Sequence, residues 1–142
     1  MQLAAALTET CHAMYDQQRT GLAPEFVRFS SRGMEVGAAH NLLRPETIES
    51  LFYMWRFTKD PKYREWGWKM FLGFEKYTKV ATGGYSGIKN VNQENSAKDD
   101  TMQTFWIAES LKYFLLLFSD DNALDLTTHT INTEAHPMRN LS

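Results

Sequence analysis

The chain has 142 residues, of which 43% are hydrophobic, so it is long and apolar enough for one domain with a substantial core. Its 15 basic and 17 acidic residues give a formal net charge of −2 without any basic run, which argues against nucleic acid or an anionic membrane surface as the main partner. The longest apolar run, Phe114–Phe118, is far shorter than the roughly 20 residues that a bilayer span requires, and no signal-peptide pattern opens the chain.

The first predicted helix covers Gln2–Gln17, where apolar residues recur at intervals of three and four. It begins without a capping residue, and we expect the parent chain to extend further upstream. Its single cysteine, Cys11, is either half of a disulfide whose other half lies outside the chain or a buried structural thiol. Gly21–Glu25 then ends the helix, and Phe26–Ser30 alternates apolar and polar residues as a short strand or extended arm does, before a turn at Ser30–Gly33.

Two helices are predicted in the middle of the chain. Pro45 suits the first position of a helix that continues to Lys59, and Asp60-Pro61 repeats the start signal for a helix that runs to about Lys79. The short connection predicts a helical hairpin, and we expect its first helix to be deeply buried because it is apolar almost all round. Residues 80–100 are predicted to form a polar loop. Successive helix pairs of this kind are typical of an αα-toroid.

The last predicted helix, Met102–Phe118, raises a question about its one buried acidic position. Glu109 lies one turn beyond Phe105 on an otherwise apolar stripe, where an ionised carboxylate needs a partner. The alternatives are a side chain that reaches water at the edge of the stripe or one that pairs with Lys112. After this helix, an extended segment carries the polar cluster Asn132–Pro137.

Two groups of residues are candidates for chemistry. Glu46 and Glu49 share one helix face, and the positive end of the helix together with Arg44 favours the ionised form of Glu46. An ionised Glu46 suits a general base, although acidic residues stabilise first turns whatever their function. Thr133 offers a hydroxyl and a carbonyl, and Glu134 a carboxylate, which is the oxygen chemistry that calcium takes. Zinc at His136 is a weaker alternative, because no second His or Cys stands at a ligand interval.

Three stretches together resemble the class I alpha-1,2-mannosidases of glycoside hydrolase family 47: Asn41–Leu51, Phe105–Asp121 and Asn132–Pro137. Shorter matches at Gly21–Glu25, Trp66–Trp68 and Gly83–Ser86 occur in the family's order, so the resemblance runs nearly from end to end. It implies an all-α fold that is part of an (αα)7 barrel with a short C-terminal β segment. Only the family's C-terminal part is covered, so residues 1–142 are expected to be the C-terminal portion of one catalytic domain, with the other barrel hairpins upstream.

The resemblance also implies residue roles. Glu46 matches the general base, and Thr133 matches the threonine whose hydroxyl and carbonyl bind Ca²⁺ directly. The general acid has no counterpart in the chain, which is therefore expected to be inactive alone. The remaining matches are pocket residues that contact the sugar or calcium-bound waters: Arg44, Glu49, Phe105, Glu109, Glu134 and Glu25.

The function that the resemblance implies is inverting, calcium-dependent hydrolysis of alpha-1,2-linked mannose from high-mannose N-glycans. The alternative is a mannose-recognising, lectin-like protein of glycoprotein quality control, in endoplasmic-reticulum-associated degradation, built on the same barrel. The shared motif Leu43–Glu46 does not separate the two. The resemblance further implies the lumen of the endoplasmic reticulum or Golgi, a disulfide between Cys11 and an upstream cysteine, and an upstream membrane anchor. No contact of this segment with a membrane or with nucleic acid is expected.

Overall fold

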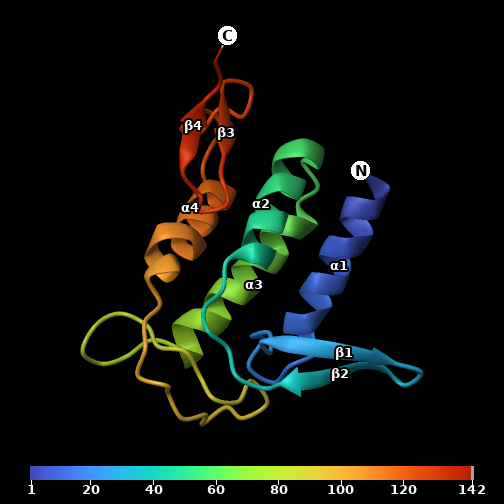
Figure 1. Cartoon of the computed structure of the whole chain (residues 1–142), viewed down its shortest axis with the longest axis vertical. Helices are drawn as coiled ribbons and strands as arrows, with labels where there is room; N and C mark the ends of the chain where they lie inside the picture. Colours follow the sequence, from blue (N-terminus) through green and yellow to red (C-terminus); the bar gives the residue numbers. More distant parts are fainter. Residues whose placement is uncertain (142) are drawn as a thin grey trace.

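The computed structural model describes residues 1–141 and shows a predominantly helical chain with two short β-hairpins (Figure 1). None of the helices in this range combines the length and the apolar character needed to cross a bilayer. The elements in chain order are α1 (Gln2–Asp16), β1 (Phe26–Ser30), β2 (Gly33–Ala38), α2 (Glu46–Thr58), α3 (Lys62–Tyr77), the π-helix η1 (Trp106–Leu111), α4 (Lys112–Phe118), the 3₁₀-helix η2 (Asp121–Ala123), β3 (His129–Ile131) and β4 (Pro137–Arg139).

The predicted helical hairpin is confirmed by α2 and α3, which pack against each other and each begin directly after a proline. The connection is tight because Lys59 adopts a left-handed conformation (φ 58°) and donates its N–H to the Trp55 carbonyl (2.9 Å). Asp60 Oδ1 then accepts the Lys62 N–H (3.0 Å) and starts α3. The expected deep burial of α2 holds for Ile48, Leu51, Phe52 and Met54, whereas Phe57 in its last turn is 60% exposed.

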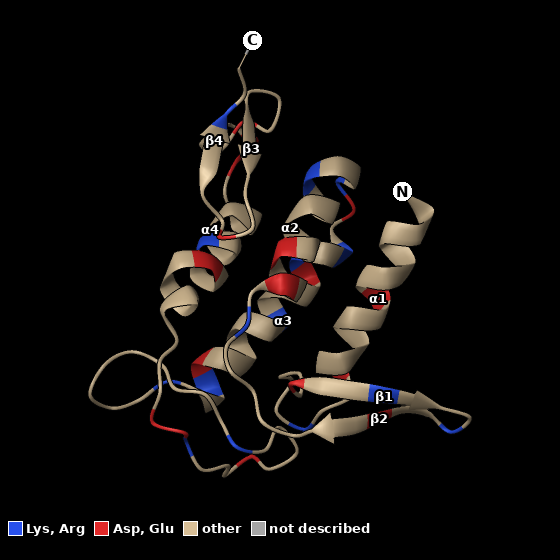
Figure 2. Ribbon diagram, in the orientation of Figure 1, with Lys and Arg blue, Asp and Glu red and all other residues tan. Residues whose placement is uncertain are grey.

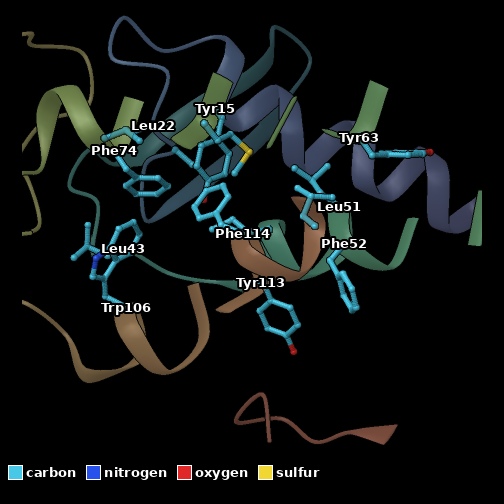
Figure 3. Close-up of a cluster of buried hydrophobic side chains, with 14 of the residues drawn as sticks. Tyr15, Leu22, Leu43, Leu51, Phe52, Tyr63, Phe74, Trp106, Tyr113 and Phe114 are labelled. Atoms are coloured by element: carbon cyan, nitrogen blue, oxygen red, sulfur yellow. The ribbon is translucent and has the colours of Figure 1, made fainter. Parts of the chain in front are cut away.

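One aromatic core joins α3 to the last helical segment. Phe74 packs against Trp106 (ring centroids 4.9 Å apart) and Phe114 (6.1 Å), and all three rings are buried. Leu22 and Leu43, from the loops before β1 and α2, belong to the same cluster (Figure 3). Because burial of each such side chain contributes about 1.5–3 kcal/mol, this cluster fixes the loops as well as the helices.

The two hairpins lie at opposite ends of the molecule (Figure 1). The predicted strand Phe26–Ser30 is confirmed as β1, and it pairs antiparallel with β2 through a turn in which Gly33 has φ 103°. At the other end, β3 and β4 pair antiparallel and confirm the short C-terminal β segment. Residues 132–136 of the polar cluster form the turn between them, and Pro137 begins β4. The Lys112 ammonium donates to the Ala135 carbonyl (2.9 Å), which holds this turn on the last helix.

The last predicted helix starts later than expected and is not uniform. Met102 lies before the helix begins, and the segment Trp106–Leu111 is π-helical before α4 begins. A π-turn is wider than an α-turn and shifts the faces on which successive side chains lie. As a result, Glu109 and Ser110 are both buried, whereas Ile107 on the same segment is exposed.

Candidate active site

A cavity of about 230 Å³ brings together three segments that are far apart in the sequence. They are the start of α2 with the residues before it, η1 with the residue before it, and the turn between β3 and β4. Figure 2 shows acidic positions at the start of α2 and on the helical segment that leads into α4. The lining residues are Arg44, Pro45, Glu46, Glu49, Phe105, Glu109, Thr133 and Glu134.

The lining therefore contains every predicted site residue except Glu25. Glu25 lines a neighbouring cavity of about 320 Å³, which shares Arg44 and Glu46 with the first. The two cavities therefore lie next to each other at the start of α2. His136, the residue that raised the zinc alternative, does not line the cavity.

The start of α2 presents Glu46 to the solvent-accessible part of the cavity. Pro45 has no N–H to satisfy, and its carbonyl accepts the Glu49 N–H (2.9 Å), so the first turn closes with both carboxylates on one side. Glu46 is exposed and lies at the N-terminal end of α2. This position suits an acceptor of protons or hydrogen bonds.

The sequence suggested that Arg44 interacts mainly with Glu46, but its main partner in the structure is Glu25. Its guanidinium donates to and forms an ion pair with Glu25, and it lies over the Phe105 ring at 5.8 Å. The hydrogen bond to Glu25 is the main reason that the Arg44 pKa is raised, and the charge of Glu46 adds a smaller contribution. Arg44 thus links the two cavities and is held against an aromatic face.

Glu109 is buried without an ion pair among residues 1–141. It is 9% exposed, and its pKa is raised by burial first and then by the charges of Glu134, Glu46 and Glu49. Lys112 opposes this shift only through its charge, because its ammonium donates to the Ala135 carbonyl instead. Glu109 therefore forms no ion pair with Lys112 among the described residues, and it lines the cavity instead. Four carboxylates gather at one cavity, which favours a bound cation or sugar hydroxyls as their partner.

The turn that carries Thr133 is fixed by its neighbours. Asn132 Oδ1 accepts the Glu134 N–H (3.0 Å) and the His136 N–H (2.9 Å), and Ala135 has φ 56°. Among residues 1–141, no group donates a hydrogen bond to the Thr133 carbonyl, and the Thr133 hydroxyl makes no hydrogen bond. Two hard oxygen donors without protein partners, beside several carboxylates, fit the ligand preferences of Ca²⁺. No three His, Cys, Asp or Glu side chains of residues 1–141 stand close enough to hold a metal by themselves.

Sequence patterns assigned no individual role to three residues that support the site: Asn41, which lines the cavity of about 320 Å³, Leu43 and Ser110. Leu43 has a positive φ of 67°; its N–H donates to Asn41 Oδ1, and its carbonyl accepts a hydrogen bond from the Ser110 hydroxyl. An Asn two residues before a constrained position is a known turn signal that could have indicated Asn41. No sequence signal indicates Ser110, because its role depends on the π-turn.

The chain is similar in sequence to proteins of one glycosidase family. The model of glycosyl hydrolase family 47 matches residues 1–140. The endoplasmic reticulum mannosyl-oligosaccharide 1,2-alpha-mannosidase of Rattus norvegicus is 51% identical over 148 aligned residues, which cover 97% of this chain and 22% of the relative. The Homo sapiens protein of the same name is 49% identical, with 97% and 21% covered. The chain thus spans about a fifth of the length of the curated relatives that it matches.

The fold agrees with a solved alpha-1,2-mannosidase from Trichoderma reesei. The TM-score is 0.87 at 31% sequence identity, over 94% of this chain and 32% of that chain. The expected fold class is therefore confirmed, and the chain has the fold of one part of that structure. Because the family model covers nearly the whole chain and the similarity extends through both sequence and fold, the chain belongs to glycosyl hydrolase family 47.

Proposed function

We propose that this chain is the C-terminal portion of the catalytic domain of an inverting, calcium-dependent exo-glycosidase that hydrolyses alpha-1,2-linked mannose from high-mannose N-glycans. The observation that carries the proposal is the cavity in which Glu46, Thr133 and Phe105 meet from three segments. The names of the relatives, mannosyl-oligosaccharide 1,2-alpha-mannosidases, support the substrate class and favour a hydrolase over a lectin.

In this mechanism Glu46 is the general base. Its ionised carboxylate, exposed at the positive end of α2, takes a proton from a water molecule that attacks the anomeric carbon. Inversion requires room for this water, so the base and the acid should stand about 6.5–9.5 Å apart. The acid belongs to a segment outside this chain.

The other cavity residues bind and orient the sugar. The ring of Phe105 offers a flat apolar face to one side of a mannose unit, and Arg44 is held beside it by Glu25. Carboxylates are hydrogen-bond acceptors only, so Glu49, Glu109 and Glu134 suit sugar hydroxyls and ordered waters.

Thr133 would hold a calcium ion through its hydroxyl and carbonyl, with waters between the ion and the surrounding carboxylates. When bound, Ca²⁺ supplies positive charge that orients the 2- and 3-hydroxyls of the mannose. The same charge would oppose the burial and the carboxylate repulsion that raise the Glu109 pKa, and Glu109 would then remain an acceptor and not act as the general acid.

The cellular setting is proposed from the relatives, which are named endoplasmic reticulum mannosidases. We infer a secretory-pathway lumen, in the endoplasmic reticulum or the Golgi, with a membrane anchor upstream. Cys11 is half-buried on α1, and burial raises the pKa of its thiol, which disfavours the reactive thiolate. This fits a structural disulfide with an upstream cysteine, and mass analysis of the non-reduced parent protein tests that pairing.

The test uses the complete catalytic domain that contains this chain, a high-mannose N-glycan as substrate, and measurement of released mannose. We expect release that stops when a chelator removes calcium, and a fall in kcat of about 10²–10⁴-fold in Glu46→Gln while the glycan still binds. Glu35→Gln, on strand β2 and outside both cavities, is the matched control and should leave kcat unchanged. Glycan binding without any release by the unmodified domain would instead favour the lectin.

A further inference from the structure

Behind the cavity, a chain of buried hydrogen bonds joins the three segments that approach the candidate base. Asn41 Nδ2 donates to the Ala23 carbonyl (2.9 Å), and Asn41 Oδ1 accepts the Leu43 N–H (2.9 Å). The Ser110 hydroxyl donates to the Leu43 carbonyl over 2.6 Å. All four residues are buried, so water does not compete for these bonds. The loop before β1, the loop before α2 and η1 are thereby connected.

Leu43 is held in a conformation that its own side chain does not favour. Its φ of 67° lies in the left-handed region, which residues other than Gly, Asn and Asp rarely adopt. The Leu43 side chain is fully buried in the aromatic core and offers no polar group to stabilise the backbone locally (Figure 3). The surroundings must therefore maintain this conformation: Asn41 Oδ1 accepts the Leu43 N–H, and the Ser110 hydroxyl donates to the Leu43 carbonyl.

The backbone of Leu43 sets the direction in which the chain enters α2, because Leu43 stands three residues before Glu46. Ser110 is the neighbour of Glu109 on η1. The hydrogen bond between Ser110 and Leu43 therefore joins the segment that carries Glu46 to the segment that carries Glu109, and it lies close in sequence to each of these carboxylates.

We propose that Ser110 is a positioning residue, which acts through the Leu43 carbonyl to hold the left-handed entry into α2 and so fixes Glu46 relative to Glu109. This inference rests on the proposed function, in which Glu46 is the general base. Without the hydroxyl, the Leu43 carbonyl has no donor, the backbone relaxes and the carboxylate of Glu46 moves. Because a displacement of about 1 Å can cost roughly 100-fold in rate, kcat should be affected much more than KM.

The test compares Ser110→Ala with a control that removes an equally buried hydroxyl elsewhere. Thr78 is fully buried and its hydroxyl donates to the Phe74 carbonyl (2.7 Å), but it lines neither cavity of the site. In the complete catalytic domain, Ser110→Ala and Thr78→Val should lower the melting temperature to a similar extent. Only Ser110→Ala should reduce kcat, by about 10–100-fold, with KM within about threefold. Ser110→Thr, which keeps the hydroxyl, should recover most of the rate.

The outcomes separate this inference from the proposed function. Equal kcat values in Ser110→Ala and Thr78→Val would overturn the positioning role and leave the hydrolase intact. If the unmodified domain hydrolyses nothing, crystal structures of the unmodified domain and of Ser110→Ala test the positioning role. The role requires that in Ser110→Ala Leu43 leaves the left-handed region and Glu46 shifts. Unchanged positions of both residues would overturn it. If Ser110→Ala does not fold, Ser110→Cys gives the same comparison, because it keeps the size of the side chain with a weaker donor.

Discussion

Glu75 and Glu109 show how the surroundings of a carboxylate decide its protonation. Glu75 accepts a hydrogen bond from the Tyr85 hydroxyl and one from the Lys79 ammonium (2.9 Å), and these bonds lower its pKa. Glu109 has no such donor among residues 1–141, and its pKa is raised by burial and by neighbouring carboxylates. The paired carboxylate stabilises the fold, whereas the unpaired one points to a ligand.

The effect of Tyr85 on Glu75 predicts a pH-dependent loss of stability. A lowered native pKa contributes stability above the ordinary Glu value of 4.5, and this contribution is lost as pH falls through the native pKa. Tyr85→Phe should therefore cost about 1 kcal/mol of unfolding free energy at pH 7, since Glu75 is partly exposed, and progressively less below pH 4.5. Unfolding curves of the complete domain at several pH values measure this difference. In a Glu75→Gln background, the loss of unfolding free energy caused by Tyr85→Phe should no longer depend on pH. If this loss is the same at every pH in both backgrounds, Glu75 is excluded as its cause.

Among the elements, the last turn of α2 is tied to a segment more than 60 residues away in the chain. The Arg56 side chain is only 7% exposed and donates from Nη2 to the carbonyls of Asp121 (2.9 Å) and Leu124 (2.7 Å). The Lys59 ammonium also pairs with Asp121 (2.5 Å). These contacts fix η2, and η2 leads through residues 124–128 to the hairpin that carries Thr133.

Arg56→Lys keeps the charge but replaces a planar fork of donors with a single ammonium, which cannot reproduce both contacts. We expect a loss of about 1–2 kcal/mol in unfolding free energy, measured by thermal or urea unfolding of the complete domain. Arg32→Lys is the matched control, because Arg32 is 83% exposed in the β1–β2 turn, and it should change stability little. If both substitutions have the same small effect, the Arg56 contacts do not stabilise this end of α2.

The sequence predicts some elements much better than others, for physical reasons. Pro45 and Asp60-Pro61 are local start signals, so α2 and α3 begin close to where expected. The strand β2 was missed, because Gly33 and Gly37 weaken its pattern and it depends on pairing with β1. The π-turn of η1 leaves no periodic signal at all, since tertiary packing selects its hydrogen-bond register.

At the scale of the molecule, apolar side chains stay exposed on several helices of residues 1–141, among them Leu3 and Leu7 on α1, Ile107 on η1 and Leu115 on α4. The chain matches about a third of the Trichoderma reesei structure. We expect these faces to pack against the other hairpins of the same barrel. The burial that the sequence pattern predicts on these helices is then completed by contacts outside this chain.

Local sequence patterns predicted single residues of the site, whereas the family resemblance predicted them as a set. Periodicity alone singled out Glu109 as anomalous and helix chemistry singled out Glu46, but neither indicates that the two share a cavity. Their segments are more than 50 residues apart, and no local rule places distant segments together. The resemblance named the residues that line the cavity, and their roles remain predictions for experiment.

Calcium should stabilise the whole domain through Thr133. A ligand that binds only the native state raises stability by about 2.7 kcal/mol at a concentration 100 times its Kd, so the melting temperature should rise with calcium and fall on chelation. Thr133→Ala should weaken this response strongly. Thr130→Ala, on strand β3 with its hydroxyl bonded to Asn140 (2.7 Å), is the control and should keep it. An equal calcium response in all three proteins would place the ion elsewhere.

The most direct measurement is the anomeric configuration of the first mannose released from an alpha-1,2-linked substrate by the complete domain, monitored by NMR before mutarotation. If Glu46 activates water in an inverting site, beta-mannose appears first and Glu46→Gln removes this product. Alpha-mannose as the first product would mean retention through a covalent intermediate and would contradict the role of Glu46 as general base.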